Sequence, residues 1–466
     1  MSADKNKSQS FKRRMVWIKS VLIAVIIIAI YYPVLSFDFV DHDDKNFIVY
    51  NPHLQQGVSL PGFKWAVTAG LTEGTPHVDY WQPVTVISRL LDAQLYGMNP
   101  SGHHATNLLI HILNAFLVWF LFSELTHGSP TAYLTAFLFA VHPLQVEPVA
   151  WVTARKDLLS VFFGLLSTLS YFRFIISGKT KKFYLWSFLF FILGTLSKPS
   201  IGIIFTVFLL MDFWPLKRIQ KSLSGIWLCL IEKIPFVIIF ACVMMAPFLS
   251  IPVSMSYYPK IIMAQIAAFH YFRYLGKILV PVNLSLYPSV FTYEYPGWLY
   301  LACVVLLLGL CFWFFKLLRQ SDPEIGFGWL WFFLLLIPFA PVNTPGDRFT
   351  YFPIIGIIFL MMSFLTKIAS RNRLDSTLVK LVLIGLILGS SVYSHRQLLI
   401  WKDTNALFEY TLRVSPENQL VQNDYGVFLM SQGKSEQAFA HYLKTQELRQ
   451  QRMDKVKEMN GNLLIN

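Results

Sequence analysis

Apolar segments long enough to cross a bilayer recur along this sequence, and they constrain its fold more than any other feature. A membrane-spanning helix needs about 20 mostly apolar residues. By this rule roughly eleven segments qualify: 16–35, 107–125, 131–150, 157–177, 183–197, 199–214, 233–252, 297–317, 328–342, 349–367 and 378–395. The chain is 55% hydrophobic and only 14% charged, whereas soluble domains are about a quarter charged. The sequence therefore predicts an all-α, polytopic membrane protein of about eleven transmembrane helices.

Basic residues gather in short loops between the apolar segments, and this distribution predicts the orientation of the chain. The formal charge of +13 would also suit nucleic-acid binding, but its clustering in short loops is the orientation signal of a membrane protein, so we exclude nucleic acid as a partner. The basic loops are 177–183, 215–222, 316–322 and 367–373. With a cytoplasmic N-terminal tail, counting the spans places the first two loops in the cytoplasm. The last two loops are cytoplasmic only if the apolar stretch 261–282 does not cross the membrane. We therefore expect a cytoplasmic N-terminus, an outer C-terminus, and 16–35 as a retained span and not a cleaved signal.

This orientation brings ionisable residues from the ends of separate spans to one outer face. They are the acidic cluster at 38–44, His142 and Glu147, Arg155, Lys156 and Asp157, Lys198, and Asp347 and Arg348. Ionisable residues at membrane depth are costly and tend to mark function. Gathered on one face, they predict a site.

The stretch "FDFVDHDDKN" (37–46) directly follows the first span and holds four aspartates, Asp38, Asp41, Asp43 and Asp44. Carboxylates this close repel one another, so we expect at least one raised pKa. Such a group can act as a general base for an acceptor hydroxyl or as a ligand for a hard divalent metal. A solvated acidic loop is the alternative, and we favour a functional role because the apolar "NFIVYN" follows at once.

The segment "FAVHPLQVEPVAWVTARKDLLS" (139–160) interrupts a span with His142, Pro143, Glu147 and Pro148. Two prolines this close distort a helix and free backbone groups that need other partners. A buried pair of His142 and Glu147 fits a structural or a catalytic role, and the sequence leaves both open. Arg155 and Lys156 at the outer exit can clamp a phosphate, with snorkelling to lipid headgroups as the alternative.

Further cations arrive from other helices. Lys198 lies in the turn "LSKPS" (196–200), and Asp347 and Arg348 open the segment "DRFTYFP" (347–353). A single such cation is usually a headgroup anchor, but several beside an acidic loop predict a site for a lipid phosphate. The segment 253–296, rich in Tyr, Pro and Ser, is expected to form a mobile cover over it.

Two other stretches of the outer part carry polar or aromatic patterns. Residues 79–97 have apolar side chains at helical spacing, which predicts an interfacial helix. His104, Asn107 and His111 share one face of the next span, where metal binding and inter-helix hydrogen bonding are both open and we favour the latter. The four cysteines, Cys229, Cys242, Cys303 and Cys311, lie in apolar stretches and have no metal or disulfide spacing, so we expect them to pack.

After Trp401 the composition is that of a soluble segment. "NDYGVFLMSQGKSEQAFAHYLKTQEL" (423–448) matches the tetratricopeptide (TPR) pattern at Tyr425, Gly426, Gly433, Ala438 and Tyr442. One repeat cannot bury its own face, so it must pack on a neighbour.

Several ordered motifs together resemble a known family. "FVDHDDKNFIVYNP", "YWQPVTVISRLLDAQLYGMNPSGHHATNLLIH", "FAVHPLQVEPVAWVTARKDLLS", "LSKPS…LLMDFWPLKR", "DRFTYFPIIG" and "WKDTNALFEYTLRVSP" are similar to bacterial relatives of the transmembrane-and-TPR O-mannosyltransferases, which are polytopic glycosyltransferases of the GT-C superfamily. The resemblance covers the chain from the first span to about residue 448.

This resemblance implies an inverting transfer of a sugar from a polyprenyl-phosphate carrier. Asp43 and Asp44 match the family's essential acidic pair. The resemblance implies Asp43 as the catalytic base and Asp44 as its supporting residue. If a Mg or Mn ion is needed, Asp41 and Asp43 would hold it. From the topology, Arg155, Lys156, Lys198 and Arg348 are the expected contacts to the carrier phosphate. His142, Glu147, Asp157, His104 and Asp347 are the expected supporting residues.

We therefore expect a glycosyltransferase of the cytoplasmic membrane that moves a sugar, mannose by the resemblance, from a polyprenyl phosphate to a protein hydroxyl on the outer side. Its partners are then the lipid-linked sugar, membrane lipids and a protein acceptor bound through the TPR-like segment. Transfer to a lipid or a polysaccharide, and a non-catalytic membrane-anchored TPR assembly protein, are the alternatives. The expected division is a basic tail 1–15, a transmembrane domain 16–396 with an outer loop 36–106, and an outer helical segment 397–466.

Overall fold

The computed structural model describes residues 2–71, 75–219, 223–246, 260–286, 297–320, 322–342, 346–370 and 373–463, and every long element in these ranges is a helix. The α-helices are α1 (Ser2–Tyr31), α2 (Pro52–Gln55), α3 (Leu60–Thr68), α4 (Pro83–Tyr96), α5 (Pro100–Leu125), α6 (Pro130–Val141), α7 (Val146–Ala150), α8 (Arg155–Ile176), α9 (Lys181–Ser197), α10 (Phe205–Phe213), α11 (Leu223–Ile231), α12 (Ile234–Met245), α13 (Lys260–Leu279), α14 (Gly297–Arg319), α15 (Pro323–Leu336), α16 (Ile354–Ala369), α17 (Arg373–Leu398), α18 (Thr404–Val414), α19 (Gln419–Ser431) and α20 (Ser435–Leu463). The predicted all-α fold is confirmed.

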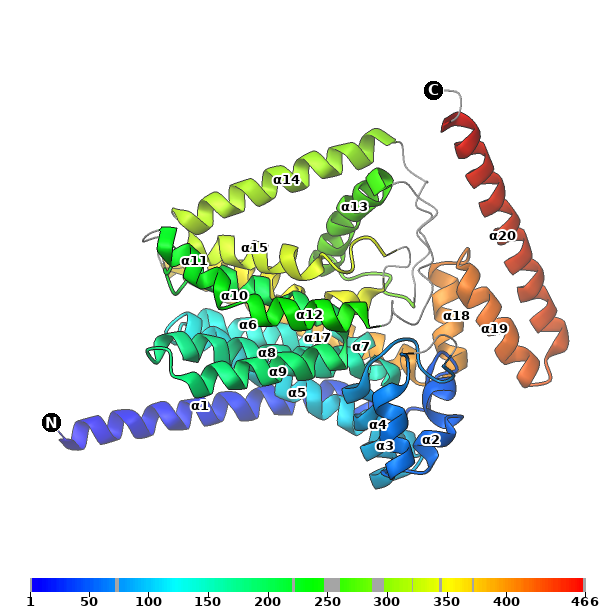
Figure 1. Cartoon of the computed structure of the whole chain (residues 1–466), viewed down its shortest axis with the longest axis horizontal. Helices are drawn as coiled ribbons and strands as arrows, with labels where there is room; N and C mark the ends of the chain where they lie inside the picture. Colours follow the sequence, from blue (N-terminus) through cyan, green and yellow to red (C-terminus); the bar gives the residue numbers. More distant parts are fainter. Residues whose placement is uncertain are drawn as a thin grey trace.

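Long apolar helices form one bundle, and the molecule has two distinct ends (Figure 1). We call the end that carries α2–α4 and α18–α20 the loop end, and the end that carries the N-terminus and the turn between α8 and α9 the tail end. Within the described residues, six helical stretches are long and apolar enough to cross a membrane by length and composition: Trp17–Ser36, Pro100–Leu125, Val152–Ile176, Gly225–Met245, Gly297–Arg319 and Ser376–Trp401. Four shorter apolar helices accompany them: Pro130–Val141, Pro199–Phe213, Pro323–Leu336 and Ile354–Ala369.

The bundle is held by one large apolar core, with a small core under the first loop. The large core runs from Ile23 in α1 to Ala438 in α20. Where α15 crosses α16, a Cβ added at Gly328 would lie 2.5 Å from the Gly356 carbonyl oxygen, so only glycine allows the two backbones to come this close. The small core includes Phe47 and Ile48, so the apolar stretch after the acidic cluster folds inward as predicted.

Several helix bounds differ from the predicted spans for local reasons. The predicted span 131–150 is a helix only to Val141, since His142 and Pro143 turn the chain into a short 3-10 segment before α7. The predicted span 233–252 begins earlier, because α11 and α12 together form the apolar stretch Gly225–Met245. Residues 247–252 lie outside the described residues.

The ambiguous segment 261–282 forms α13, which Figure 1 shows inclined steeply to α14 and α1. Among the described residues, α13 is not one of the helices that are long and apolar enough to cross a membrane. Its C-terminal turn reaches the loop end, where Lys277 forms an ion pair with Asp347. The arrangement is consistent with a helix that does not cross, and the count of eleven crossings stays a prediction.

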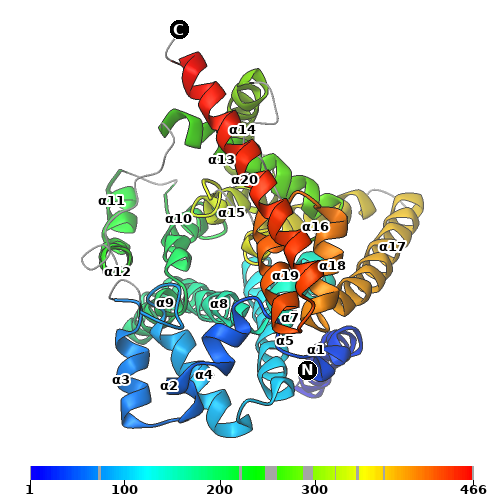
Figure 2. The same ribbon diagram turned by 90° about the vertical axis from the view of Figure 1, so that its right-hand side faces the viewer.

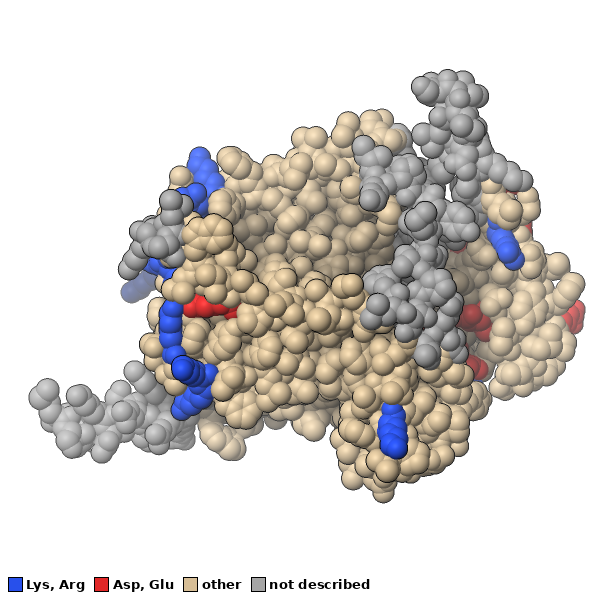
Figure 3. All heavy atoms as spheres, viewed as in Figure 1, with Lys and Arg blue, Asp and Glu red and all other residues tan. Residues whose placement is uncertain are grey.

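Basic side chains are concentrated at the tail end, although both ends carry charges of both signs (Figure 3). In Figure 3 most of the visible Lys and Arg side chains gather at the tail end, and acidic side chains appear beside the C-terminal helices. This is the distribution that the basic loops 177–183 and 215–222 predict when they share one side.

The C-terminal helices pack against the loop end (Figure 2). α18 to α20 follow one another as antiparallel neighbours. A Cβ added at Gly426 in α19 would lie 3.0 Å from the Tyr442 ring of α20, so the glycine allows this close contact. Ala438 is fully buried beside them. The TPR-like spacing of Gly426, Ala438 and Tyr442 thus corresponds to a real contact between α19 and α20. The four cysteines are free of disulfides, and Cys229 and Cys303 are buried as expected, whereas Cys242 is exposed.

Candidate functional site

The acidic loop has an unusual backbone. Asp43 lies in the left-handed region with φ 67°, which a residue other than glycine seldom adopts and which tends to persist at functional sites. A π-helix, Lys45–Val49, follows directly, and such turns also concentrate at functional sites. The loop is held by the Lys45 ammonium, which donates to Asp41 at 2.9 Å, and by the Phe47 N–H, which donates to the Asp43 carbonyl at 2.7 Å.

Asp44 is buried, and its carboxylate anchors the loop to the turn before α8. Its Oδ1 accepts hydrogen bonds from the Thr153 N–H at 2.8 Å and the Thr153 hydroxyl at 2.6 Å, and its Oδ2 accepts from the Val40 N–H at 3.3 Å. Burial raises the pKa of Asp44 to about 7, although the bonds from Thr153 and Val40 lower it. A raised pKa is expected in this cluster, and Asp44 has one, but its cause is burial and not the expected repulsion between neighbouring carboxylates.

Asp43 is half-buried and contrasts with its neighbour. Within the described part of the chain, no hydrogen bond or ion pair occupies its carboxylate, although the Arg89 guanidinium attracts it electrostatically. Asp41, by comparison, is neutralised by Lys45. Of the three predicted carboxylates, Asp43 is the one left available to accept a proton.

A cavity of about 420 Å³ opens at the loop end between α8, α12 and the segment before α16. Lys156, Lys198 and Arg348 line one part of it, together with Asp79 and Tyr80. Apart from Ser200, the rest is apolar: Pro199, Phe240, Val243, Met244, Pro338, Phe339, Val342 and Phe349. Its volume lies in the usual range of about 300–1,000 Å³ for ligand pockets. Three of the four predicted phosphate contacts therefore meet in one cavity beside an apolar wall.

Each of these three cations has its own carboxylate. Lys156 pairs with Asp79, Lys198 pairs with Asp157, and the Arg348 Nη1 donates to Glu147 Oε1 at 2.8 Å. Burial raises the pKa of Asp79, but the Lys156 ammonium more than offsets this effect and leaves that pKa below its ordinary value.

The pairing leaves room for a ligand. A lysine ammonium has three donors, so Lys156 and Lys198 can keep their carboxylates and also donate to a phosphate oxygen. The predicted supporting residues Asp157 and Glu147 thus hold the cations in place.

Trp151 joins the cavity to the acidic loop. Its indole N–H donates to the His42 carbonyl at 3.0 Å, and the Arg348 guanidinium carbon lies 4.7 Å from the centre of its ring. The backbone one residue before Asp43 and a cation of the cavity therefore contact the same side chain. The acidic loop and three of the four predicted cations therefore lie at the same end of the bundle. Their placement on the outer face of the membrane stays a prediction.

Arg89 was missed by the sequence reasoning. It is almost fully buried, and its Nη2 donates to the Thr153 carbonyl at 3.0 Å, on the residue that binds Asp44. It attracts Asp79 of the cavity as well as Asp43 and Asp44 of the loop, so it lies between the two halves of the site. One sequence feature could have identified Arg89. It is an arginine among the apolar positions of the amphipathic helix predicted at 79–97, and its neighbour Leu90 is buried.

Arg155 does not join the cavity, and its assignment as a phosphate contact is wrong. Its guanidinium is fully buried and donates to Asp92 at 2.7 Å, to the His103 carbonyl at 2.8 Å and to Ser88 at 2.9 Å, with a further bond to Asn107. It ties α8 to α4 and α5, so its role is structural.

The predicted His142–Glu147 pair does not form. His142 Nε2 lies 3.0 Å from the Ile278 carbonyl, and its Nδ1 accepts from the Leu144 N–H, whereas Glu147 turns to Arg348. Asp347 pairs with Lys277 and not with the cavity cations. Both His142 and Asp347 therefore fasten α13 to the loop end.

The histidine face of α5 is also structural. His104 is buried, 6.4 Å from the Phe37 ring. His111 bridges the Tyr351 hydroxyl at 2.8 Å and the Ala140 carbonyl at 3.1 Å, and Asn107 donates to the Trp151 carbonyl at 3.2 Å. Inter-helix hydrogen bonding, the favoured interpretation, is confirmed for His111 and Asn107.

The acidic loop does not form a ligand set for a divalent metal. Asp41 is held by Lys45 and Asp44 by Thr153, so both carboxylates already have other partners. Among the described ranges no group of three or more His, Cys, Asp or Glu side chains is placed to hold a metal ion. We therefore derive no step through a metal.

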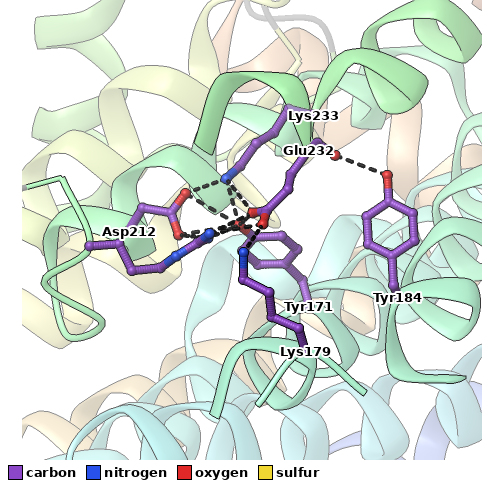
Figure 4. Close-up of polar contacts among 7 residues, drawn as sticks. Tyr171, Lys179, Tyr184, Asp212, Glu232 and Lys233 are labelled. Atoms are coloured by element: carbon purple, nitrogen blue, oxygen red, sulfur yellow. Dashed lines mark hydrogen bonds and ion pairs between the residues drawn. The ribbon is translucent and has the colours of Figure 1, made fainter. Parts of the chain in front are cut away.

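A second charged cluster, not predicted from the sequence, lies at the tail end of the bundle (Figure 4). Buried Asp212 accepts from Arg218 at 2.8 Å and pairs with Lys233, and the Tyr171 hydroxyl lies 3.2 Å from its carboxylate. Glu232 accepts from Arg218 at 2.9 Å and from Lys179 at 3.0 Å. We call these residues the tail-end cluster, and they fasten the start of α12 to α8 and α10.

Comparisons with known proteins agree with the predicted resemblance. Residues 91–245 match the family described as dolichyl-phosphate-mannose-protein mannosyltransferase. Protein O-mannosyl-transferase TMTC1 of Homo sapiens is 27% identical over 471 residues, covering 86% of this chain and 52% of the human protein. Protein O-mannosyl-transferase TMTC4 of Mus musculus is 38% identical over 151 residues, covering 29% of this chain and 20% of the mouse protein. The chain is thus a relative of these transferases and spans about half the length of the human one.

Two solved structures are also similar to the chain. The Archaeoglobus fulgidus oligosaccharyltransferase in its apo form is 12% identical, with a TM-score of 0.48, and the match covers 83% of this chain and 56% of that one. ArnT from Cupriavidus metallidurans, bound to undecaprenyl phosphate, is also 12% identical, with a TM-score of 0.39, and covers 87% of this chain and 79% of that one.

Proposed function

We propose that the protein is a glycosyltransferase that moves a sugar from a polyprenyl-phosphate carrier to a hydroxyl of a protein acceptor, on the outer side of the cytoplasmic membrane. The observation that carries this proposal is the cavity in which Lys156, Lys198 and Arg348 face an apolar wall. A lipid phosphate needs both surfaces, since its head group is anionic and its chain is apolar. The similarity to O-mannosyl-transferases supports a sugar as the transferred group and mannose as the first sugar to test.

In this proposal the cavity binds the phosphate that leaves. The carrier phosphate lies on the three cations, and its isoprenoid chain lies along α12, where Phe240, Val243 and Met244 face the cavity. As the bond from the anomeric carbon to the phosphate oxygen breaks, negative charge builds on the phosphate. Fixed cations stabilise this charge because they need no reorganisation during the reaction.

Asp43 then acts on the other side of the anomeric carbon. Its carboxylate accepts the proton of the acceptor hydroxyl as the hydroxyl oxygen bonds to that carbon, and the departing electron pair stays on the carrier phosphate. Asp44 and Arg89 are positioning residues, because both hold the loop through Thr153. Trp151 keeps the loop at a fixed distance from Arg348.

The proposal is tested by offering the purified protein a panel of polyprenyl-phosphate sugars and a serine- and threonine-rich polypeptide. Released polyprenyl phosphate and glycosylated polypeptide are both measured. We expect acceptor-dependent release for one sugar, reduced about 10²- to 10⁴-fold in Asp43→Asn, as for loss of a general base, and about 10²- to 10³-fold in Lys198→Gln or Arg348→Gln.

Glu124→Gln and Arg173→Gln are the matched controls, because this ion pair is exposed on the far turns of α5 and α8. Both should keep full activity. If no sugar is released from any carrier, or if Asp43→Asn keeps the activity of the Glu124→Gln control, the proposal is wrong.

A further inference from the structure

A second cavity, of about 720 Å³, lies at the loop end. It shares no lining residue with the donor cavity. One wall comes from the first loop, with Asp38, Phe39, Lys45 and Tyr50. The other comes from the C-terminal helices, with Glu409 of α18 and Phe428 of α19. We call it the loop–helix groove.

Bonds between the two walls fix the shape of the groove. The Asp38 N–H donates to the Lys402 carbonyl at 3.1 Å, and the Asp41 N–H donates to the Thr404 hydroxyl oxygen at 2.8 Å. His42 Nδ1 lies 3.1 Å from Asp424 Oδ2. These contacts hold the residues directly before Asp43 against the start of α18 and against α19. The groove is therefore a built feature that runs beside the proposed base.

The groove combines aromatic surface with negative charge. Tyr50 is 62% exposed, and Phe39 and Phe428 lie in the same lining. Lys45 is neutralised by Asp41 at 2.9 Å, and Lys402 lies 3.6 Å from Asp403.

Two lining carboxylates remain without a cation. Among the described residues no ion pair reaches Asp38 or Glu409, and Glu409 accepts only from neutral donors, Asn405 at 2.9 Å and the Tyr425 hydroxyl at 3.5 Å. Two such carboxylates in a chain of formal charge +13 select for a cationic ligand.

We propose that the loop–helix groove binds an extended segment of the protein acceptor that carries a lysine or arginine near the hydroxyl residue. A polypeptide can offer a cation to Asp38 and Glu409 and apolar side chains to Tyr50 and Phe428. An anionic lipid would be repelled, and a neutral glycan would leave the carboxylates unused. This proposal rests on the proposed function for its acceptor and adds the chemistry by which that acceptor is recognised.

The test uses photo-cross-linking on the full chain, with the photoreactive residue p-benzoyl-phenylalanine placed at Phe428. Two serine-containing peptides of equal length, one flanked by lysine and one by glutamate, are compared without any donor sugar. We expect cross-linking to favour the lysine peptide by about tenfold, the difference between an attractive and a repulsive exposed charge pair. In Glu409→Lys the preference should invert, which a merely disturbed fold would not produce.

Glu417→Lys is the control, because Glu417 is exposed on the same segment but outside the groove. It should keep the preference for lysine. Equal cross-linking of both peptides, an unchanged preference in Glu409→Lys, or capture of a neutral oligosaccharide in place of either peptide would overturn the proposal. Since no donor is present, peptide binding is measured even if the chain releases no carrier phosphate, so failure of the groove and failure of the transferase function are told apart.

Discussion

Asp43 and Asp44 are neighbours in the chain but have opposite surroundings. Asp44 is buried, and its hydrogen bonds with Thr153 fix the loop. Asp43 has a positive φ, and among the described residues its carboxylate accepts no hydrogen bond. The positive φ lies at Asp43 itself, directly before the carboxylate that Thr153 holds. The proposed division into base and positioning residue thus follows from the different burial and hydrogen bonding of the two carboxylates.

The raised pKa of Asp44 gives a prediction about stability and pH. An unfolded aspartate titrates near about 4, and burial raises the pKa of Asp44 in the folded protein to about 7. The folded state therefore binds a proton between these values that the unfolded state has lost. Stability from this group is fully present below about pH 4 and is lost as the pH rises through about 7, by up to about 4 kcal/mol at about 1.4 kcal/mol per unit.

Denaturant unfolding of the detergent-solubilised protein between pH 4.5 and 8.5 measures this effect. Asp44→Asn cannot titrate, so its free energy of unfolding should fall less with pH than that of the native chain, and Asp43→Asn should follow the native curve more closely. Parallel curves for Asp44→Asn and the native chain would show that Asp44 does not titrate in this range.

Among the elements, α12 has a special place because it connects the donor cavity with the tail-end cluster. Its first turn is fixed by Lys233, which pairs with Asp212, and by Phe236, which is fully buried against Phe191 and Phe208. Its last turns carry Val243 and Met244 of the cavity wall. A buried ion pair is weak support for stability in itself, so its value here lies in holding α12 in one position.

Breaking this pair should be costly, and replacing both partners should not. Asp212→Asn removes the nearest carboxylate of the buried Lys233 ammonium and leaves it only Glu232, at 3.9 Å. We therefore expect a loss of up to about 3–5 kcal/mol in the free energy of unfolding. The double variant Asp212→Asn with Lys233→Met removes both charges, and Arg218, which loses Asp212, keeps Glu232 at 2.8 Å. It should therefore recover most of that loss. Thermal unfolding in the same detergent compares the two, with Lys367→Ala, which removes the exposed partner of Asp322, as the neutral control. A double variant no more stable than Asp212→Asn would contradict this account.

At the scale of the elements, the sequence predicts most of the fold but not the rotation of each helix. Hydropathy locates the long helices, and proline positions explain why α6 ends at Val141. Arg155 and Lys156, however, point about 100° apart on an α-helix, so only one of them can face the cavity. Which one does depends on how α8 packs against α4 and α5, and hydropathy does not contain this information. Arg89 was missed for the same reason.

For the whole molecule, the central feature is that the acidic loop and the cations come together at one end of the bundle. The sequence predicts this from the positions of the basic loops, and Trp151 supplies the physical contact between His42 and Arg348. The loop–helix groove, in contrast, depends on the contact between Asp41 and Thr404, which are 363 residues apart. A pairing so distant leaves no local signal, and so the groove could not be predicted. Of the predicted cover at 253–296, residues 260–286 are described and begin with α13, whereas 253–259 and 287–296 lie outside the described residues. Its role as a cover stays a prediction.

The most direct test of the central claim is the side of the membrane on which each part lies. In a chain whose native cysteines are replaced, single cysteines at Asn46 in the acidic loop, Val342 in the donor cavity and Lys181 at the tail end are treated with a membrane-impermeant thiol reagent in right-side-out vesicles. We predict labelling at positions 46 and 342 in intact vesicles, and at 181 only after the membrane is permeabilised. Labelling that placed positions 46 and 342 on opposite sides would contradict a shared active site.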